Sequence, residues 1–385
     1  MSDSNRVAVA AKVEVTPGTA PAGPYQAINI SSTNLNAQKN TAEENTIRSD
    51  RNLRNTVMTS MVPQGGFGFD FIYGNLDTFI PGIMGSALGP AISLAAIAGT
   101  VTGAVFAATA GTPFSAVVVG QWLGIKIGTT KYVGKVTAIG GAGASITLAG
   151  VTLPSGAQTL ASVKGQVVRN GTTMLTYTIE KQFADQATKG FFAFTGMVPN
   201  VLNLNAQAEQ IVTGDLSFLG MNAPVPSDTS ISGSAYTAAV TNESFAGLSG
   251  NIGQFMVGGS LILPTDVAIK GVSVAINTNA RRDVAINVTN MGWGQFGVTG
   301  TLNTYFKGGL AAVDAFFTHA DSSFSYVMTD PQGNICVVSC LNLKYTDFNP
   351  QVGGKNQAVM GDLQFAAKLD TATGASFQFD FITGL

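Results

Sequence analysis

The sequence predicts a mainly β chain with two tandem antiparallel β-sandwich or barrel domains, each with a short helix, and a small inserted β domain. Three observations lead to this fold class. Large apolar residues alternate with Gly and polar residues, as in half-buried antiparallel strands. Only 11% of the 385 residues are charged and 46 are Gly, so the chain is rich in turns. One strand pattern occurs twice, as QIVTGDLSF at residues 210–218 and QAVMGDLQF at residues 357–365.

The duplicated strand belongs to a longer internal repeat. Residues 173–183 and 189–205 match residues 322–332 and 333–349 at an offset of about 147, which is also the offset of the duplicated strand. Earlier in the chain, the stretches GGFGFDFIYG and LDTFI match GQFGVTGTLN and VDAFF at an offset of about 229 to 237. The offsets differ by roughly 80 residues, so the first copy must carry an insertion of that length.

The repeat therefore sets the predicted domain organisation. The first domain is discontinuous and comprises residues 1–87 and 171–223, a linker covers 224–234, and the second domain covers 235–385. The insert, residues 88–170, is predicted to hold three or four Gly-separated strands reached through an Ala/Gly/Thr-rich connector. Its residues 91–112 have the length of a membrane-spanning helix. Small residues dominate there and interfacial anchors are missing, so a connector or buried β segment is favoured.

Each copy is expected to contain one short helix between its strands. The helical spacing that predicts it is carried by Leu76, Phe79, Ile80 and Ile83 in the first copy and by Leu310, Val313, Phe316 and Phe317 in the second. Pro81 predicts that the first helix is bent or short.

The strand patterns also predict which faces are wet. Phe67, Phe69 and Phe71 alternate with Gly and Asp. In the duplicated strand, alternation places Leu216 and Phe218 on one face and Asp215 on the other, and the second copy places Asp362 in the same way.

The residues that enzymes need are scarce in this sequence. His319 is the only histidine, and no phosphate-binding loop, nucleophile elbow or metal-ligand spacing occurs, so neither an enzyme nor a cofactor is expected. Cys336 and Cys340 would lie about 13 Å apart on a strand, too far for a disulfide with each other, and are expected to be buried thiols. The net charge of −2 does not indicate a basic surface that would bind nucleic acid. No signal peptide pattern follows Met1.

Two clusters of charge stand out against this background. Arg48, Asp50 and Arg51 form the first, and Arg281, Arg282 and Asp283 form the second. Both are consistent with a solvated hairpin or loop. The alternative interpretation is that they form ion pairs between subunits, where charge complementarity fixes register and specificity.

Several stretches together resemble a known family. The lead KVEVTPGTAPAGPYQAI, then NTIRSDRNLRNTVMTS and GGFGFDFIYGNLDTFIPGIMGSAL, are similar to the start of a major tail tube protein of long-tailed, siphovirus-type bacteriophages. RNGTTMLTYTIEKQF and FTGMVPNVLNLNAQAEQIVTGDLSFLG continue the likeness. The insert resembles the extra small domain of some members, and the C-terminal GQFGVTGTLNTYF, DPQGNICVV and LKYTDFNPQVGGKN resemble the second tube domain of duplicated members. Most of the chain is covered.

The resemblance implies a structural role in the virion tail, after assembly in the bacterial host cytoplasm. Members stack as rings whose subunits close one antiparallel barrel, and a duplicated chain would form rings of three with pseudo-six-fold symmetry rather than rings of six. The implied partners are other copies, the tape measure, tail terminator and distal tail or baseplate proteins, and double-stranded DNA that passes through the lumen without specific binding; no membrane is involved. Asp215 and Asp362 become candidates for the lumen wall, or alternatively for an outer wet face.

A second function class remains open at this point. Another self-assembling β-rich virion or surface protein, such as a decoration or adhesin subunit, would share much of this composition. Glycan binding would call for clustered exposed aromatic residues, and the chain has only two Trp, Trp122 and Trp293.

Overall fold

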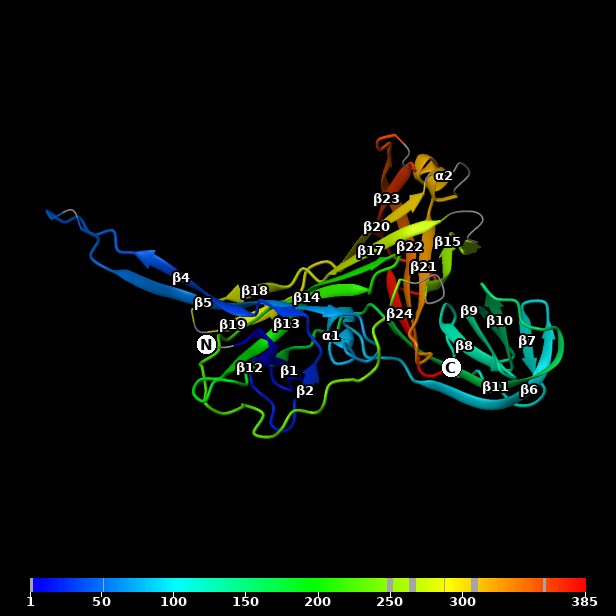
Figure 1. Cartoon of the computed structure of the whole chain (residues 1–385), viewed down its shortest axis with the longest axis horizontal. Helices are drawn as coiled ribbons and strands as arrows, with labels where there is room; N and C mark the ends of the chain where they lie inside the picture. Colours follow the sequence, from blue (N-terminus) through cyan, green and yellow to red (C-terminus); the bar gives the residue numbers. More distant parts are fainter. Residues whose placement is uncertain are drawn as a thin grey trace.

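The computed structural model describes residues 3–50, 52–247, 252–262, 268–286, 288–305, 311–355 and 358–385. Its described part is mainly β, with two α-helices and three β-rich bodies (Figure 1). We call these bodies the first sandwich, the small barrel and the second sandwich. The mainly β class expected from strand alternation is therefore confirmed.

The first sandwich is built from two separated stretches of chain. Its elements are the 3-10 turn η1 (Ser4–Arg6), β1 (Val7–Val13), β2 (Gln26–Ile28), β3 (Ser32–Thr33), β4 (Asn36–Glu43), β5 (Thr56–Asp70), α1 (Ile80–Met84), β12 (Tyr177–Phe183), β13 (Phe191–Gln207) and β14 (Thr213–Leu219). Pro81 lies in the first turn of α1, and Gly85 ends the helix in the left-handed conformation with φ 64°. The first helix is short, as Pro81 predicts.

The small barrel occupies the long interval between α1 and β12. Its strands are β6 (Ile92–Thr102), β7 (Val105–Ala108), β8 (Trp122–Ile127), β9 (Thr130–Gly140), β10 (Ser145–Ala149) and β11 (Gly156–Arg169). They pair in the closed order β6–β7–β10–β9–β8–β11–β6 around a separate apolar core. Within the Ala/Thr-rich residues 91–112, residues 92–108 form β6, β7 and their turn, as the β alternative predicts, because closure supplies partners for both strands of this hairpin.

The second sandwich repeats the first with small changes. Its elements are β15 (Ile252–Val257), β16 (Ser260–Ile262), β17 (Ile269–Asn277), β18 (Arg281–Val284), β19 (Thr289–Gly292), β20 (Gly297–Tyr305), α2 (Ala311–Thr318), β21 (Ser322–Thr329), β22 (Ile335–Gln351), β23 (Met360–Ala367) and β24 (Phe377–Ile382). Leu310, expected in the second helix, lies outside the described residues. Cys336 and Cys340 are buried on β22 as free thiols.

One 17-residue strand in each sandwich runs through both of its layers. The first half of β13 pairs with β12 in an outer layer, and its second half pairs with β14 in an inner layer. β22 does the same with β21 and β23. Register shifts between Pro199 and Val201 and between Tyr345 and Asp347 mark the crossing points. A bulge bends and twists a strand, which lets it leave one layer for the other.

The inner layers of the two sandwiches form one continuous sheet. Its order is β4–β5–β14–β13–β17–β20–β23–β22, with every neighbouring pair antiparallel. The joint is the pairing of β13 with β17, from Val201 opposite Asn277 to Gln207 opposite Gly271. Both sandwiches therefore contribute to one sheet face.

The small barrel packs on the outer layer of the second sandwich. Along β21 and β22, Tyr326 and Val338 point into the sandwich core, whereas Val327 and Val337 point outward and pack with Trp122 of the barrel. β24 continues this layer and pairs with β11. The barrel and the inner sheet therefore lie on opposite sides of the second sandwich.

A buried carboxylate fastens the barrel to β24. Asp380 is fully buried and accepts hydrogen bonds from the Trp122 backbone N–H at 3.0 Å and from Gln378 Nε2 at 2.6 Å. Loss of water raises the pKa of Asp380 to about 7, although these hydrogen bonds and the nearby cations Arg169 and Lys135 favour its charged form.

Tight glycine packing in the inner sheet gives a prediction about stability. A Cβ at Gly300 on β20 would collide with the ring of Phe365 and the carbonyl oxygen of Ser273, so Gly300→Ala should lower the free energy of unfolding by about 1–3 kcal/mol. Gly297→Ala on the same strand is the control, because its Cβ would meet only the Asn277 oxygen at 4.0 Å. Equal thermal midpoints for the two variants would contradict the packing described.

The buried carboxylate gives a prediction about pH. The pKa of Asp380 rises from an ordinary 3.8 to about 7 on folding, so the folded state holds a proton that the unfolded state has lost. Asp380 should therefore make the protein lose stability as pH rises from about 4 to about 7, with no further loss above that range. The thermal midpoint of the wild type should fall relative to that of Asp380→Asn across this window. A constant difference between the two proteins would show that Asp380 does not titrate there.

Candidate functional site

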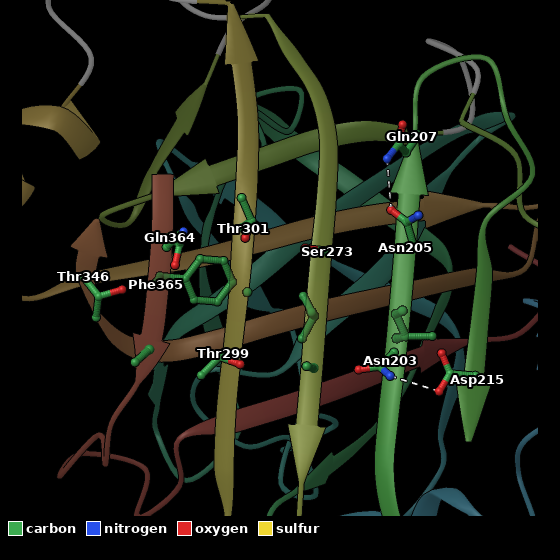
Figure 2. A pocket seen from close by; sticks show the side chains of 15 residues that line it. Asn203, Asn205, Gln207, Asp215, Ser273, Thr299, Thr301, Thr346, Gln364 and Phe365 are labelled. Carbon is green, nitrogen blue, oxygen red and sulfur yellow. Dashed lines mark hydrogen bonds between the residues drawn. The ribbon is translucent and has the colours of Figure 1, made fainter. Parts of the chain in front are cut away.

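The exposed side of the inner sheet is a broad polar surface, which we call the polar face. At its centre is an open hollow of about 680 Å³, lined by residues from β14, β13, β17, β20, β23 and β22. Figure 2 shows its side chains pointing from neighbouring strands into the same space. Its polar lining residues are Asn203, Asn205, Gln207, Asp215, Ser273, Thr299, Thr301, Thr346 and Gln364.

Strand alternation produces this surface from the sequence. On β13, Leu202 and Leu204 point into the core, so the asparagines between and beyond them point outward. The registers align the strands: Asn203 lies opposite both Asp215 and Ala275, and Thr301 lies opposite both Ser273 and Gln364. The polar residues of six strands therefore share one side.

The polar face carries negative charge. Among the described residues that line the hollow, Asp215 is the only ionisable one. It accepts a hydrogen bond from Asn203 Nδ2 at 3.0 Å, and Asp362 accepts one from Gln351 Nε2 at 3.1 Å. Gln364 Nε2 lies 3.5 Å from Asp347 Oδ2. Amide donors satisfy these carboxylates without neutralising them.

Lys344 lies on the side of β22 that faces the polar face, but its ammonium group makes contacts at the border of that face. Lys344 lies opposite Ala366 on β23. Its Nζ donates to the His319 carbonyl oxygen at 2.6 Å and lies 3.5 Å from Asp321 Oδ1. Its charge is therefore directed to the end of α2 rather than to the hollow.

The polar face continues onto the first sandwich. On β4 and β5, Asn40 donates to Ser60 at 2.9 Å and Gln64 donates to Gln38 at 2.7 Å. Beyond these contacts the two strands extend as a ribbon away from the body of the molecule (Figure 1). Amides and hydroxyls thus follow the inner sheet from β4 to β22.

Both candidate lumen residues lie on this one face. Asp215 and Asp362 belong to different sandwiches. Each lies opposite an asparagine on the polar side of the neighbouring strand, Asn203 for Asp215 and Asn349 for Asp362. What this surface encloses in an assembly stays a prediction. The sequence-based site candidates included no residue of β13, β17 or β20, although the alternation in VLNLNAQ, VSVAIN and VTGTLN carries the same signal.

The first charged cluster lies in the connection between β4 and β5, and the second lies on β18 of the β18–β19 hairpin. Arg48 contacts Asp50 at 2.6 Å, and this ion pair lowers the pKa of Asp50 to about 2. Arg281 contacts Asp283 at 3.1 Å. The neighbouring Arg282 donates to the Met221 carbonyl oxygen at 3.2 Å, and Arg51 lies outside the described residues. These contacts are within one chain, so ion pairing between subunits stays a prediction.

Other kinds of site find little support in the described part of the chain. No group of three His, Cys, Asp or Glu residues is placed to hold a metal ion among the described residues. No described helix has the length and apolar composition to cross a membrane. Trp122 is fully buried and Trp293 packs against Gly85, so neither offers an open stacking platform for a sugar.

Neighbouring residues on β14 allow the polar face to be tested apart from the core. Asp215→Asn should change the free energy of unfolding by less than about 0.5 kcal/mol, because Asp215 is exposed and its partner is an amide. Leu216→Ala should cost about 2–5 kcal/mol, because Leu216 is buried in the core. Chemical denaturation measures both values. A large loss in Asp215→Asn would mean that the carboxylate serves the fold.

Comparison with known proteins agrees with this architecture. The family model for phage tail tube proteins matches residues 4–379. A search of curated proteins gives no match. The matched range includes the first sandwich, the small barrel, every strand of the polar face, and the second sandwich as far as the middle of β24. The chain belongs to the phage tail tube protein family.

Proposed function

We propose that this virion tail protein polymerises as stacked rings whose lumen conducts the DNA genome into the host. The observation that carries the proposal is the polar face, which spans both sandwiches and presents carboxylates, amides and hydroxyls. Its role is structural, with no catalytic step. Asp215 and Asp362 belong to the lumen wall in this proposal.

The chemistry of the face suits a passage for DNA. Each lysine or arginine on the wall would neutralise a phosphate, release counterions and hold the duplex in place. Aspartates repel phosphates instead, and the amides that satisfy Asp215 and Asp362 leave their negative charge intact. A duplex inside such a wall would slide without being gripped.

The sheet edges support assembly into closed rings. An exposed sheet edge is a template for another strand, and closure into a barrel removes it. The internal repeat makes one chain equivalent to two tube domains, so three chains would form a pseudo-six-fold ring. Cyclic closure followed by head-to-tail stacking gives a tube.

The placement of the small barrel fits the same proposal. It covers the outer layer of the second sandwich, through Trp122 against Val327 and Val337, and therefore lies away from the polar face. In a tube whose lumen is the polar face, the barrel would decorate the outside. The proposed partners are further copies of this chain, the tape measure, the tail terminator and the distal tail or baseplate proteins, which meet in the host cytoplasm during assembly.

Negative-stain microscopy and DNA capture test the proposal together. The purified wild type should form rings or tubes with a central channel, and tubes assembled with short DNA duplexes should protect none from nuclease. Thr301→Lys/Gln364→Lys adds two cations to the polar face, so its tubes should trap protected DNA that is released as salt increases.

A matched variant places the same charges elsewhere. Ala98→Lys/Thr100→Lys adds two lysines at exposed positions of β6 on the small barrel and should protect no DNA. Monomers under all conditions would refute the tube. Equal protection by the two lysine variants would refute the lumen assignment.

A further inference from the structure

Two edges of the inner sheet end without a partner strand in the described part of the chain. β4 pairs with β5 on one side only. On β22, the residues after Leu343 pair with β23 on one side, whereas the opposite side is taken by β21 only as far as Leu343; β24 pairs with residues 335–340 on the side that β23 continues. These edges lie at opposite ends of the eight-stranded order. A strand edge with unpaired backbone groups recruits another strand.

The joint inside the chain shows what such an edge accepts. β13 presents the same edge as β22, and β17 fills it with Val201 opposite Asn277 and Asn203 opposite Ala275. At the bulge, the Thr278 backbone N–H donates to the Asn200 carbonyl oxygen at 2.9 Å. This pairing is therefore a complete template with a defined register.

The pairing partners establish which residues of the two sandwiches are equivalent. Asn203 lies opposite Asp215 and Asn349 lies opposite Asp362, at the same place in the duplicated strand. The bulges follow at matching positions, beside Val201 and Asp347. The second half of β22 is therefore the counterpart of the second half of β13.

The same comparison identifies the counterpart of β17. Ser217 and Gln364 hold the same position in the duplicated strand; Ser217 lies opposite Gly66 of β5, and Gln364 lies opposite Thr301 of β20. Two residues earlier, Gln64 lies opposite Asn36 of β4 and Thr299 lies opposite Ala275 of β17. β4 is therefore the counterpart of β17, with Asn36 in the place of Ala275.

We propose that the second half of β22 in one copy pairs antiparallel with β4 of the next copy, with Asn349 opposite Asn36 and Asp347 opposite Gln38. The inference rests on the proposed ring and specifies its joint. In this joint the Thr346 carbonyl oxygen corresponds to the Asn200 carbonyl oxygen of the internal joint. It accepts a hydrogen bond from the Lys39 backbone N–H. Asp347 then faces a glutamine, so no like charges meet across the joint, and the amide opposite a carboxylate repeats the Asn203–Asp215 pair.

The helices provide a second, independent indication of the same neighbour. In the first sandwich, a Cβ on Gly85 at the end of α1 would lie 2.7 Å from Cζ3 of Trp293, so the second sandwich covers this helix end. In the second sandwich, α2 leaves Phe317 73% exposed. On the β4–β5 ribbon, Met58 of β5 is 52% exposed. Pairing of β4 with β22 carries this ribbon over α2.

Disulfide trapping tests the register. Asn349→Cys/Asn36→Cys places two thiols in directly opposite positions, where antiparallel Cα atoms are about 4.5–5.5 Å apart, within the range of a disulfide. Asn203→Cys/Ala275→Cys is the matched control, because it copies the pair inside one chain. Asn349→Cys/Asn40→Cys is the register control, displaced by about 13 Å. The native cysteines are fully buried and contribute little background.

Each variant is oxidised under the conditions in which the wild type assembles and is then denatured without reductant. The inference requires covalent dimers and trimers from Asn349→Cys/Asn36→Cys, with no larger species, and at least a tenfold lower yield from the register control. The Asn203→Cys/Ala275→Cys control should oxidise within single chains. Wild-type tubes without cross-links at the proposed pair would overturn the joint while leaving the proposed function intact, whereas a wild type that never assembles would overturn both.

A surface variant separates the interface from folding. Phe317→Asp should leave the thermal midpoint of the monomer nearly unchanged, because the ring is exposed in a single chain, and should reduce ring formation at least tenfold. Val118→Asp, on the small barrel and 40% exposed, should assemble like the wild type. Normal assembly of Phe317→Asp would show that α2 is not covered by the next copy.

Discussion

The pairing of β13 with β17 is the constraint on which the rest of the molecule depends. It converts the inner layers of two sandwiches into one sheet, with Val201 opposite Asn277 and Gln207 opposite Gly271. A shift of one residue in this register would send Leu202 and Leu204 to the wet side and the asparagines into the core. Because both strands have one strongly apolar side, the register is fixed by burial, and the polar residues of the two halves must then share a face.

The long strands make this arrangement compatible with a closed core. β13 and β22 each serve the outer layer with their first halves and the inner layer with their second halves, and the bulges beside Val201 and Asp347 are where they cross. The outer layers are then free for other contacts. In the second sandwich this side takes the small barrel through Trp122 and Asp380, and in the first, buried Glu180 accepts hydrogen bonds from Ile231 and Tyr236 of the segment between the sandwiches.

Much of the fold could be predicted from the sequence because duplication repeats the same physical requirements. The GDL strands around Asp215 and Asp362 reveal the repeat, and alternation reveals their polar sides. The continuous sheet could not be predicted, since strand alternation says which side of β13 or β17 is wet but not which strand lies beside which. The residues 91–112 left a connector and a β segment as alternatives for a related reason: small residues give weak periodicity, and barrel closure makes strands of them. The buried contacts of Asp380 could not be predicted. One partner, Trp122, comes from a distant segment of the chain, and the other, Gln378, lies on the same strand as Asp380.

In the proposed ring, the joint inside one chain and the joint between chains are physically different. Inside the chain, β17 is tethered to β13, so its effective concentration is high and the joint forms as the chain folds. In the proposed ring, the joint between chains forms only when a second copy is present, and in the single chain the β4–β5 ribbon leaves Val57 and Met58 about half exposed. A two-stranded ribbon has marginal stability on its own and gains stability by acquiring a third strand. The described structure therefore contains one finished joint and, in the proposed ring, the two halves of another, which would let a subunit fold alone and close a ring only with its neighbours.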